Sequence, residues 1–302
     1  MIFQELLDRY YPKAQKAVLE LFQAADANQV NENDIFLIIQ NGHFEPVIAR
    51  SRKLNGLDLS PYVFGSGSVG IKEGSTLSIW FEHYITENII QGKREDYYRW
   101  LKSKKDWDKE YNVKMQYDLL FYLRFWESEF VLKLFRELTL LAVGQPYNWH
   151  LTIKGYQRSE FIKKKILNKL KNVSPGFYRY INTIYYPELR NAIAHTLFFN
   201  LGETFTFDTF EKTHPRRSMK SVELDIITNK VFALYMALNK INYDLNKEYL
   251  KAYKEKHFGI NVQVPRSWDR NQLRTEWIKV YNKRWIWYQT WAKHYRKNFS
   301  IS

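Results

Sequence analysis

The sequence predicts a mainly α-helical protein whose centre is a helical bundle, and three segments carry this prediction. Residues 117–144 form a long segment whose apolar side chains cover most of a helix circumference before Gly144 and Pro146 end it. Residues 158–172 place their apolar side chains on one helical face, and residues 221–245 show the same amphipathic pattern. At 302 residues the chain is long enough for one or two domains around a large core.

The composition limits the chemistry and the class of protein. The chain contains 20 Phe, 22 Tyr and 10 Trp, which is typical of a folded globular protein. It contains no cysteine, and this excludes disulfides, thiolate nucleophiles and cysteine-based zinc sites. The first residues lack the pattern of a signal peptide, and no apolar run approaches the roughly 20 residues that span a bilayer. We therefore expect a soluble, cytoplasmic protein with no membrane partner.

The charge of the chain favours a polyanionic partner. The net charge is +14, and nucleic acid is the partner that such a surplus most often serves. The alternative is that the positive charge serves only to keep the protein soluble. The net charge alone does not decide between a nucleic-acid partner and general solubility.

The N-terminal third, residues 1–111, is predicted to be an accessory region with a sensing or regulatory role. Its first segment has a helical apolar face, and Pro12 is a candidate start of a second helix. Residues 33–46 fit a strand or a helix, residues 64–75 read as a Gly- and Ser-rich loop, and residues 76–85 are ambiguous. Residues 93–109 fit a surface helix or a connector. The residues of the first apolar face are Leu7, Tyr10, Ala14, Val18, Leu21, Phe22 and Ala25.

Residues 112–250 are predicted to form the bundle of four to five helices. Within residues 158–172, Ile162, Ile166, Leu167 and Leu170 share one face, and lysines cover the rest. Residues 203–210 alternate with period two, which predicts a short strand or hairpin after the helix that begins at Pro187.

Residues 251–302 are predicted to form a basic, aromatic C-terminal extension. They hold 12 Lys and Arg against three acids, and five of the ten tryptophans. Cations between flat rings can bind single-stranded RNA. We favour a helix instead for most of these tryptophans, because Trp277, Tyr281 and Trp285 are spaced as a helical core face. The basic face remains a candidate RNA contact.

The segment "ELRNAIAH", residues 188–195, carries the most specific chemical signal. Pro187 suits the first position of a helix, and Glu188 suits the positive end of its dipole. Asn191 and His195 are four residues apart and share a face, and the long side chain of Arg190 can reach the same volume. The spacing therefore presents a guanidinium, an amide and an imidazole from one helix.

Those three groups suit RNA cleavage without a metal. The ribose 2′-hydroxyl is an internal nucleophile that needs a general base, and an imidazole that titrates near neutrality is well matched to that role. A guanidinium pairs with the phosphate oxygens as charge develops on them. The alternative is that Arg190 is a solvated side chain and His195 an ordinary surface or core residue. The combination of Arg-Asn with a histidine at this spacing occurs once in the chain.

This segment resembles the signature of the HEPN superfamily, in which an arginine and a polar residue precede a histidine. The resemblance covers less than half the chain. It implies a HEPN-like helical bundle, a homodimer that joins two copies of the motif in one cleft, and metal-independent endoribonuclease activity. It also implies catalytic positions for Arg190, Asn191 and His195. Many members are toxins or antiviral, abortive-infection effectors, so an antitoxin or other regulatory protein is an expected partner.

The remaining expectations concern RNA contacts and competing functions. Lys163 and Lys164, with Arg216 and Arg217 in a loop, are candidate RNA-binding residues, although solvated surface positions explain them as well. The histidines outside the motif show no metal-ligand spacing, so neither a metal nor another cofactor is expected. A non-catalytic RNA-binding or scaffold protein with a HEPN-like dimer interface is the second hypothesis. A toxin that modifies, or is modified by, a nucleotidyl partner is the third.

Overall fold

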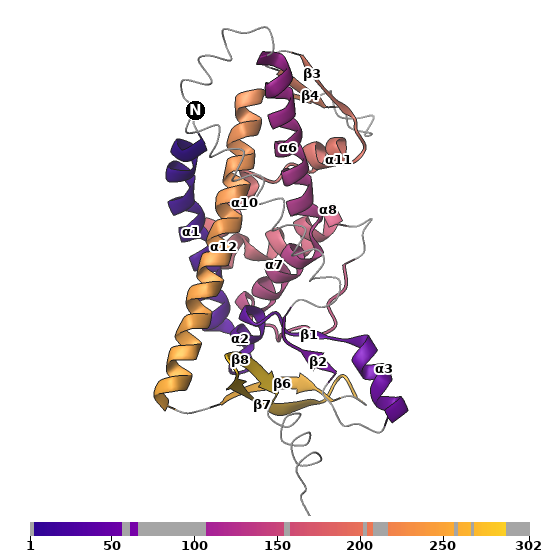
Figure 1. Ribbon diagram of the computed structural model, residues 1–302, viewed down its shortest axis with the longest axis vertical. Helices are drawn as coiled ribbons and strands as arrows, with labels where there is room; N and C mark the ends of the chain where they lie inside the picture. Colours follow the sequence, from indigo (N-terminus) through magenta and orange to yellow (C-terminus); the bar gives the residue numbers. More distant parts are fainter. Residues whose placement is uncertain are drawn as a thin grey trace, which may run out of the picture.

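The computed structural model is mainly helical, with small antiparallel sheets (Figure 1). It describes residues 3–55, 61–65, 107–153, 158–201, 204–207, 217–256, 259–266 and 269–287. No helix in these ranges is both long enough and apolar enough to cross a membrane.

Two long helices run side by side along the bundle (Figure 1). They are α1 (Phe3–Asn28) and α12 (Ser221–Lys256). The apolar face predicted for the first segment is buried, and Ala14, Val18 and Leu21 have no exposed surface. Pro12 lies inside α1 and begins no second helix, which corrects that expectation. Burial of the face on both sides of Pro12 outweighs the loss of one backbone hydrogen bond.

The long apolar segment is two helices rather than one. α6 (Trp107–Glu127) and α7 (Glu129–Ala142) are separated by Ser128, whose hydroxyl accepts a hydrogen bond from the N–H of Val131 at 3.3 Å. This is the N-cap interaction that satisfies an unpaired donor in the first turn of a helix. α7 still ends before Gly144, which has the positive φ of 71° that favours glycine.

Short helices complete the bundle between α7 and α12. The predicted apolar face of residues 158–172 is confirmed, because Ile162, Ile166, Leu167 and Leu170 are all at most 5% exposed. A π-helical stretch, η2, lies within this segment. The bounds are α8 (Arg158–Glu160), η2 (Phe161–Leu167), α9 (Asn168–Val173), α10 (Pro175–Asn182) and α11 (Pro187–Ala194).

The N-terminal segment belongs to the bundle, which corrects the expected division at residue 111. The side chains of α1 share one continuous core with those of α6, α7, α10, α11 and α12. An amphipathic helix of 26 residues buries its apolar face against whichever helices surround it, regardless of their distance along the sequence. Residues 56–60 and 66–106, which hold most of the predicted loop and connector, lie outside the described residues.

A hairpin follows α11, as predicted. β3 (Phe198–Leu201) pairs antiparallel with β4 (Thr204–Phe207), and β4 pairs with β5 (Arg217–Lys220). Phe205 and Phe207 alternate inward onto the core of the bundle. Arg217 therefore begins a strand rather than lying in the expected loop, whereas Arg216 lies outside the described residues.

The helical interpretation of the C-terminal tryptophans is wrong. β6 (Ile260–Pro265), β7 (Leu273–Tyr281) and β8 (Arg284–Trp287) form an antiparallel sheet, and α12 extends beyond residue 250 to Lys256. Asn282 and Lys283 have positive φ and make the two-residue connection between β7 and β8. Trp285 and Trp287 point to one face of the sheet and Trp277 to the other, in the period of two that strands require.

This sheet covers a second, smaller hydrophobic core at one end of the bundle. Trp285 and Trp287 pack there with Phe36, Tyr62 and Trp149. Phe36 comes from α2 (Asp34–Ile39), the segment that the sequence left open between strand and helix. Nearby lie β1 (His43–Phe44), β2 (Tyr62–Val63) and α3 (Pro46–Asn55). Trp268 and Trp291 lie outside the described residues.

Candidate functional site

α11 is the helix that carries the arginine-histidine motif, and it begins at Pro187 as the sequence predicts. Tyr186 precedes it in an extended conformation. The hydroxyl of Tyr122, a buried residue of α6, accepts a hydrogen bond from the N–H of Tyr186 at 2.8 Å and lies 3.4 Å from its carbonyl oxygen. Leu189 and Ile193 are buried against the core. The motif helix is therefore fixed to α6 at its start and along its apolar face.

His195 lies at the C-terminal end of α11, one turn beyond Asn191. Its N–H donates to the carbonyl of Asn191 at 3.1 Å, and the N–H groups of Thr196 and Leu197 bond back to Ile193 and Ala192. Thr196 adopts a left-handed φ of 58°. These bonds form a Schellman motif, the usual way to satisfy the last carbonyls of a helix. His195 is exposed at this end of the helix.

The guanidinium of Arg190 is held by two neighbours. Its Nη2 forms an ion pair with Glu127 at the end of α6, and its Nη1 donates to Oδ1 of Asn191 at 2.8 Å. The side chains of Arg190 and Glu127 are 15% and 22% exposed. Because Asn191 is the next residue on the same helix, the guanidinium and the amide form one fixed unit.

Glu127 also pairs with Arg158 at the start of α8, so one carboxylate joins two arginines. Beside them, burial raises the pKa of the Tyr185 hydroxyl, and the positive charge of Arg190 opposes that rise. The structure pairs Arg190 with Glu127. Nothing in the sequence spacing identifies Glu127 or Arg158, because they lie on other elements and meet α11 only through tertiary packing.

Of the three predicted catalytic residues, the structure brings the side chains of Arg190 and Asn191 into contact. Among the described residues, the hydrogen bond and ion pair of Arg190 go to Asn191 and Glu127, and not to His195. Lys163 and Lys164 are exposed on η2, close in sequence to Arg158, and Lys164 pairs with Glu160 at 2.6 Å. The side chain of Arg217 lies outside what the structure describes.

A hollow of about 650 Å³ lies beside the start of α11 and the hairpin. Its lining is partly apolar and includes Tyr186, Met219 and Ile226. Lys230 contributes an ammonium group whose pKa is lowered by burial and by the nearby Lys13 and Arg9. Within the described residues, no group of three or more His, Asp or Glu could hold a metal ion.

Comparisons of the chain with protein-family models, with curated proteins and with solved structures find no match.

Proposed function

We propose that the protein is a metal-independent endoribonuclease, with a HEPN-like bundle, that acts in the cytoplasm as a toxin or an antiviral, abortive-infection effector. The observation that carries the proposal is the exposure of His195 at the end of the same short helix that holds the guanidinium of Arg190. A buried imidazole could not reach an RNA backbone. The excess of positive charge supports an RNA substrate.

Each residue has a role in this mechanism. His195 removes the proton from the ribose 2′-hydroxyl, or returns a proton to the departing 5′-oxygen. The 2′-oxygen forms a bond to phosphorus while the bond to the 5′-oxygen breaks. Arg190 stabilises the charge on the phosphate, and Asn191 orients Arg190 or a phosphate oxygen. The products are a 2′,3′-cyclic phosphate and a 5′-hydroxyl.

The proposal includes a homodimer in which two α11 helices line one cleft. A second copy of the motif would bring a second imidazole and a second guanidinium into the same cleft. The proposal also includes contacts of Lys163, Lys164, Arg216 and Arg217 with the RNA backbone. An antitoxin or other regulatory protein restrains the nuclease.

RNA cleavage by the purified full chain tests the proposal. We expect cleavage in the presence of EDTA, fragments that end in a 2′,3′-cyclic phosphate, and loss of cleavage with retained RNA binding in His195→Ala. Asn182→Ala, a change on the exposed surface of α10, serves as the control and should cleave normally. Loss of cleavage on chelation, or full activity of His195→Ala, would show that the mechanism is wrong.

The engagement of Arg190 favours one second candidate. Because Glu127 and Asn191 already hold its guanidinium within one protomer, the motif can instead stiffen a dimer interface in a non-catalytic RNA-binding or scaffold protein. In that case native protein does not cut RNA, and His195→Ala changes only the assembly. Light scattering on the native protein and on His195→Ala measures the assembly. Combined with the cleavage assay, it distinguishes the nuclease from the scaffold.

A further inference from the structure

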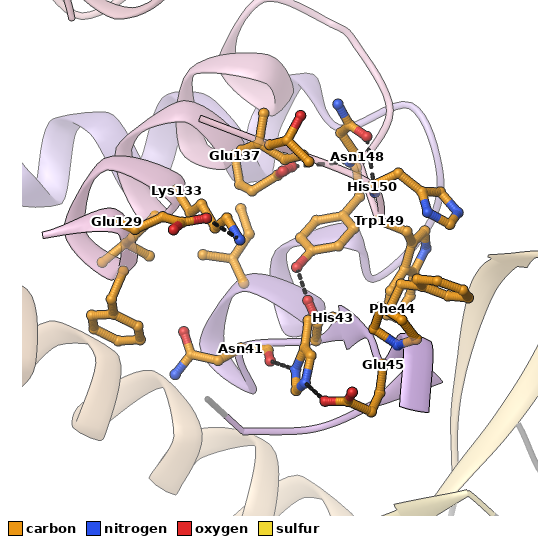
Figure 2. Close-up of a pocket in the computed structure, with 18 of the residues that line it drawn as sticks. Asn41, His43, Phe44, Glu45, Glu129, Lys133, Glu137, Asn148, Trp149 and His150 are labelled. Atoms are coloured by element: carbon orange, nitrogen blue, oxygen red, sulfur yellow. Dashed lines mark hydrogen bonds and ion pairs between the residues drawn. The ribbon is translucent and has the colours of Figure 1, made fainter. Parts of the chain in front are cut away.

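A second pocket lies between α7 and the segment that holds β1 and the start of α3 (Figure 2). β1 and α3 lie at the end of the molecule away from α11 (Figure 1). Its volume is about 660 Å³, within the range of small-molecule sites in proteins. The walls come from α7, from β1 and the start of α3, and from residues 147–152. The function proposed for α11 makes no use of this pocket.

Aromatic rings with fixed positions form much of the wall. The hydroxyl of Tyr147 donates to the carbonyl of Gly42, and Nε1 of Trp149 donates to the carbonyl of Gln263 at 3.1 Å. Phe44 packs against the ring of His150 with their centroids 4.6 Å apart (Figure 2). Because the polar ends of Tyr147 and Trp149 are bound to backbone carbonyls, these side chains line the pocket with apolar surface.

Glu137 contributes a neutral carboxyl group to the wall. It is 5% exposed, and its Oε2 accepts a hydrogen bond from the N–H of Asn148 at 3.0 Å (Figure 2). Burial raises its pKa to about 8, and Asp34 adds to the rise, whereas Arg136 and Lys133 oppose it. A protonated carboxyl offers one donor and one acceptor.

His150 adds a polar atom with an unmet hydrogen bond. Its Nε2 is buried, and it has no hydrogen-bond partner among the described residues. Burial and the nearby Arg270 lower its pKa, so the neutral ring is favoured. A buried polar atom without a partner is costly, and a ligand that bonds to it removes that cost.

The positive charge at the pocket is only partly compensated. Lys133 pairs with Glu129 at 2.7 Å, and His43 lies 3.7 Å from Glu45. Arg50 and Arg270 also line the pocket, and neither forms an ion pair with a carboxylate among the described residues. The guanidinium of Arg270 lies 6.0 Å from the ring centre of Phe44, so it borders the aromatic wall.

We propose that this pocket binds a nucleotide, with the base against the aromatic wall and hydrogen-bonded to Glu137 and His150, and the phosphate held by Arg50 and Arg270. The base offers flat faces and an edge with both donors and acceptors, which matches a neutral carboxyl and an imidazole. A phosphate accepts paired hydrogen bonds from guanidinium groups. A ligand with only one of these two parts would leave the other half of the pocket unused.

Calorimetric titration of the full chain with AMP, GMP, CMP and UMP tests the proposal. We expect at least one to bind with a dissociation constant below about 1 mM, and the matching nucleoside and ribose 5-phosphate each to bind about tenfold more weakly. If none of the four binds, the proposal is wrong. If an aromatic amine such as tyramine binds in their place, the pocket accepts cations and the proposal is equally wrong.

Variants locate the bound nucleotide. Arg270→Ala should weaken binding about tenfold, because one charge-assisted contact is lost. Arg179→Ala removes the same charge from the exposed surface of α10 and should bind as the native protein does. Binding that survives Arg270→Ala but is lost in Arg190→Ala would place the nucleotide at α11 and overturn the assignment. None of these readouts depends on RNA cleavage, so failure of the proposed nuclease leaves this test intact.

Discussion

Glu127 connects two arginines that come from different parts of the chain, and it is the residue that fixes the geometry of the motif. Its carboxylate pairs with Arg190 and with Arg158, and all three side chains are between 15% and 22% exposed. Removing one partner of an ion pair at this depth costs more than breaking a surface pair, because it leaves a partly buried charge uncompensated. A change at Glu127 leaves two partly buried cations without their partner.

We expect Glu127→Ala to lower the free energy of unfolding by about 2 kcal/mol, less than the loss of a fully buried pair. Urea denaturation of the native and variant proteins measures the change. Asp244→Ala is the matched control, since it breaks the exposed pair with Lys240 on α12 and should leave the unfolding midpoint nearly unchanged. Equal midpoints for all three proteins would mean that the Glu127 network does not stabilise the fold.

Glu137 predicts a dependence of stability on pH. Burial raises its pKa from 4.5 to about 8, and burial also raises the pKa of the neighbouring Asp34. The folded chain therefore binds more protons than the unfolded chain between these values, and stability falls as pH rises through this window. For Glu137 alone the slope reaches up to about 1.4 kcal/mol per pH unit.

Urea denaturation at about pH 5 and about pH 8 measures this slope. Glu137→Gln should lose less stability than the native protein between the two conditions, because the amide does not ionise. The groups that face Glu137 are Asp34 from α2, Lys133 and Arg136 from α7, and Tyr147 from the following segment. They are unchanged in the variant, so the difference between the two proteins reports the ionisation of Glu137 together with its effect on Asp34. Identical slopes would contradict the prediction.

At the scale of the element, α11 ends in a conformation that its sequence disfavours. Thr196 is β-branched and has a φ of 58°, where glycine is the common residue. We expect Thr196→Gly to raise the free energy of unfolding by about 1 kcal/mol. Thr183→Gly, at the end of α10 where φ is −85°, should lower it instead. Thermal unfolding of the two variants measures the opposite signs, and a loss of stability in both would refute the argument.

Some elements could be predicted because the spacing of their own apolar residues shows which face is buried. The face of Ile162, Ile166 and Leu170, the helix that begins at Ser221 and the hairpin after α11 all follow from local periodicity. The end of α6 and the start of α7 at Ser128 could not be predicted from the sequence, because the apolar pattern continues on both sides of that residue. The C-terminal sheet was missed because Trp277 and Trp285 fit a helical spacing, and only their packing partners reveal the strands.

The same distinction holds for the candidate site. The start of α11 at Pro187 and the closeness of Arg190 to Asn191 follow from positions along one helix. The contacts with Glu127 depend on how α6 meets α11. The pocket around Glu137 joins segments far apart in the sequence, so no spacing along the chain indicates it.

At the scale of the whole molecule, the net charge of +14 predicts that RNA binding depends on salt. Each lysine that contacts a phosphate releases a counterion, and the logarithm of affinity falls by about 0.7 per contact for each tenfold rise in salt. If Lys163 and Lys164 contact the backbone, their double change to alanine should reduce this slope by about 1.4. Filter binding of a single-stranded RNA at several salt concentrations measures the slope. Lys240 and Lys247, which are exposed on α12, provide a double variant with the same loss of charge. Because counterion release requires contact, this second variant should keep the native slope, and an equal reduction in both variants would show that overall charge, rather than a defined RNA path near η2, governs binding.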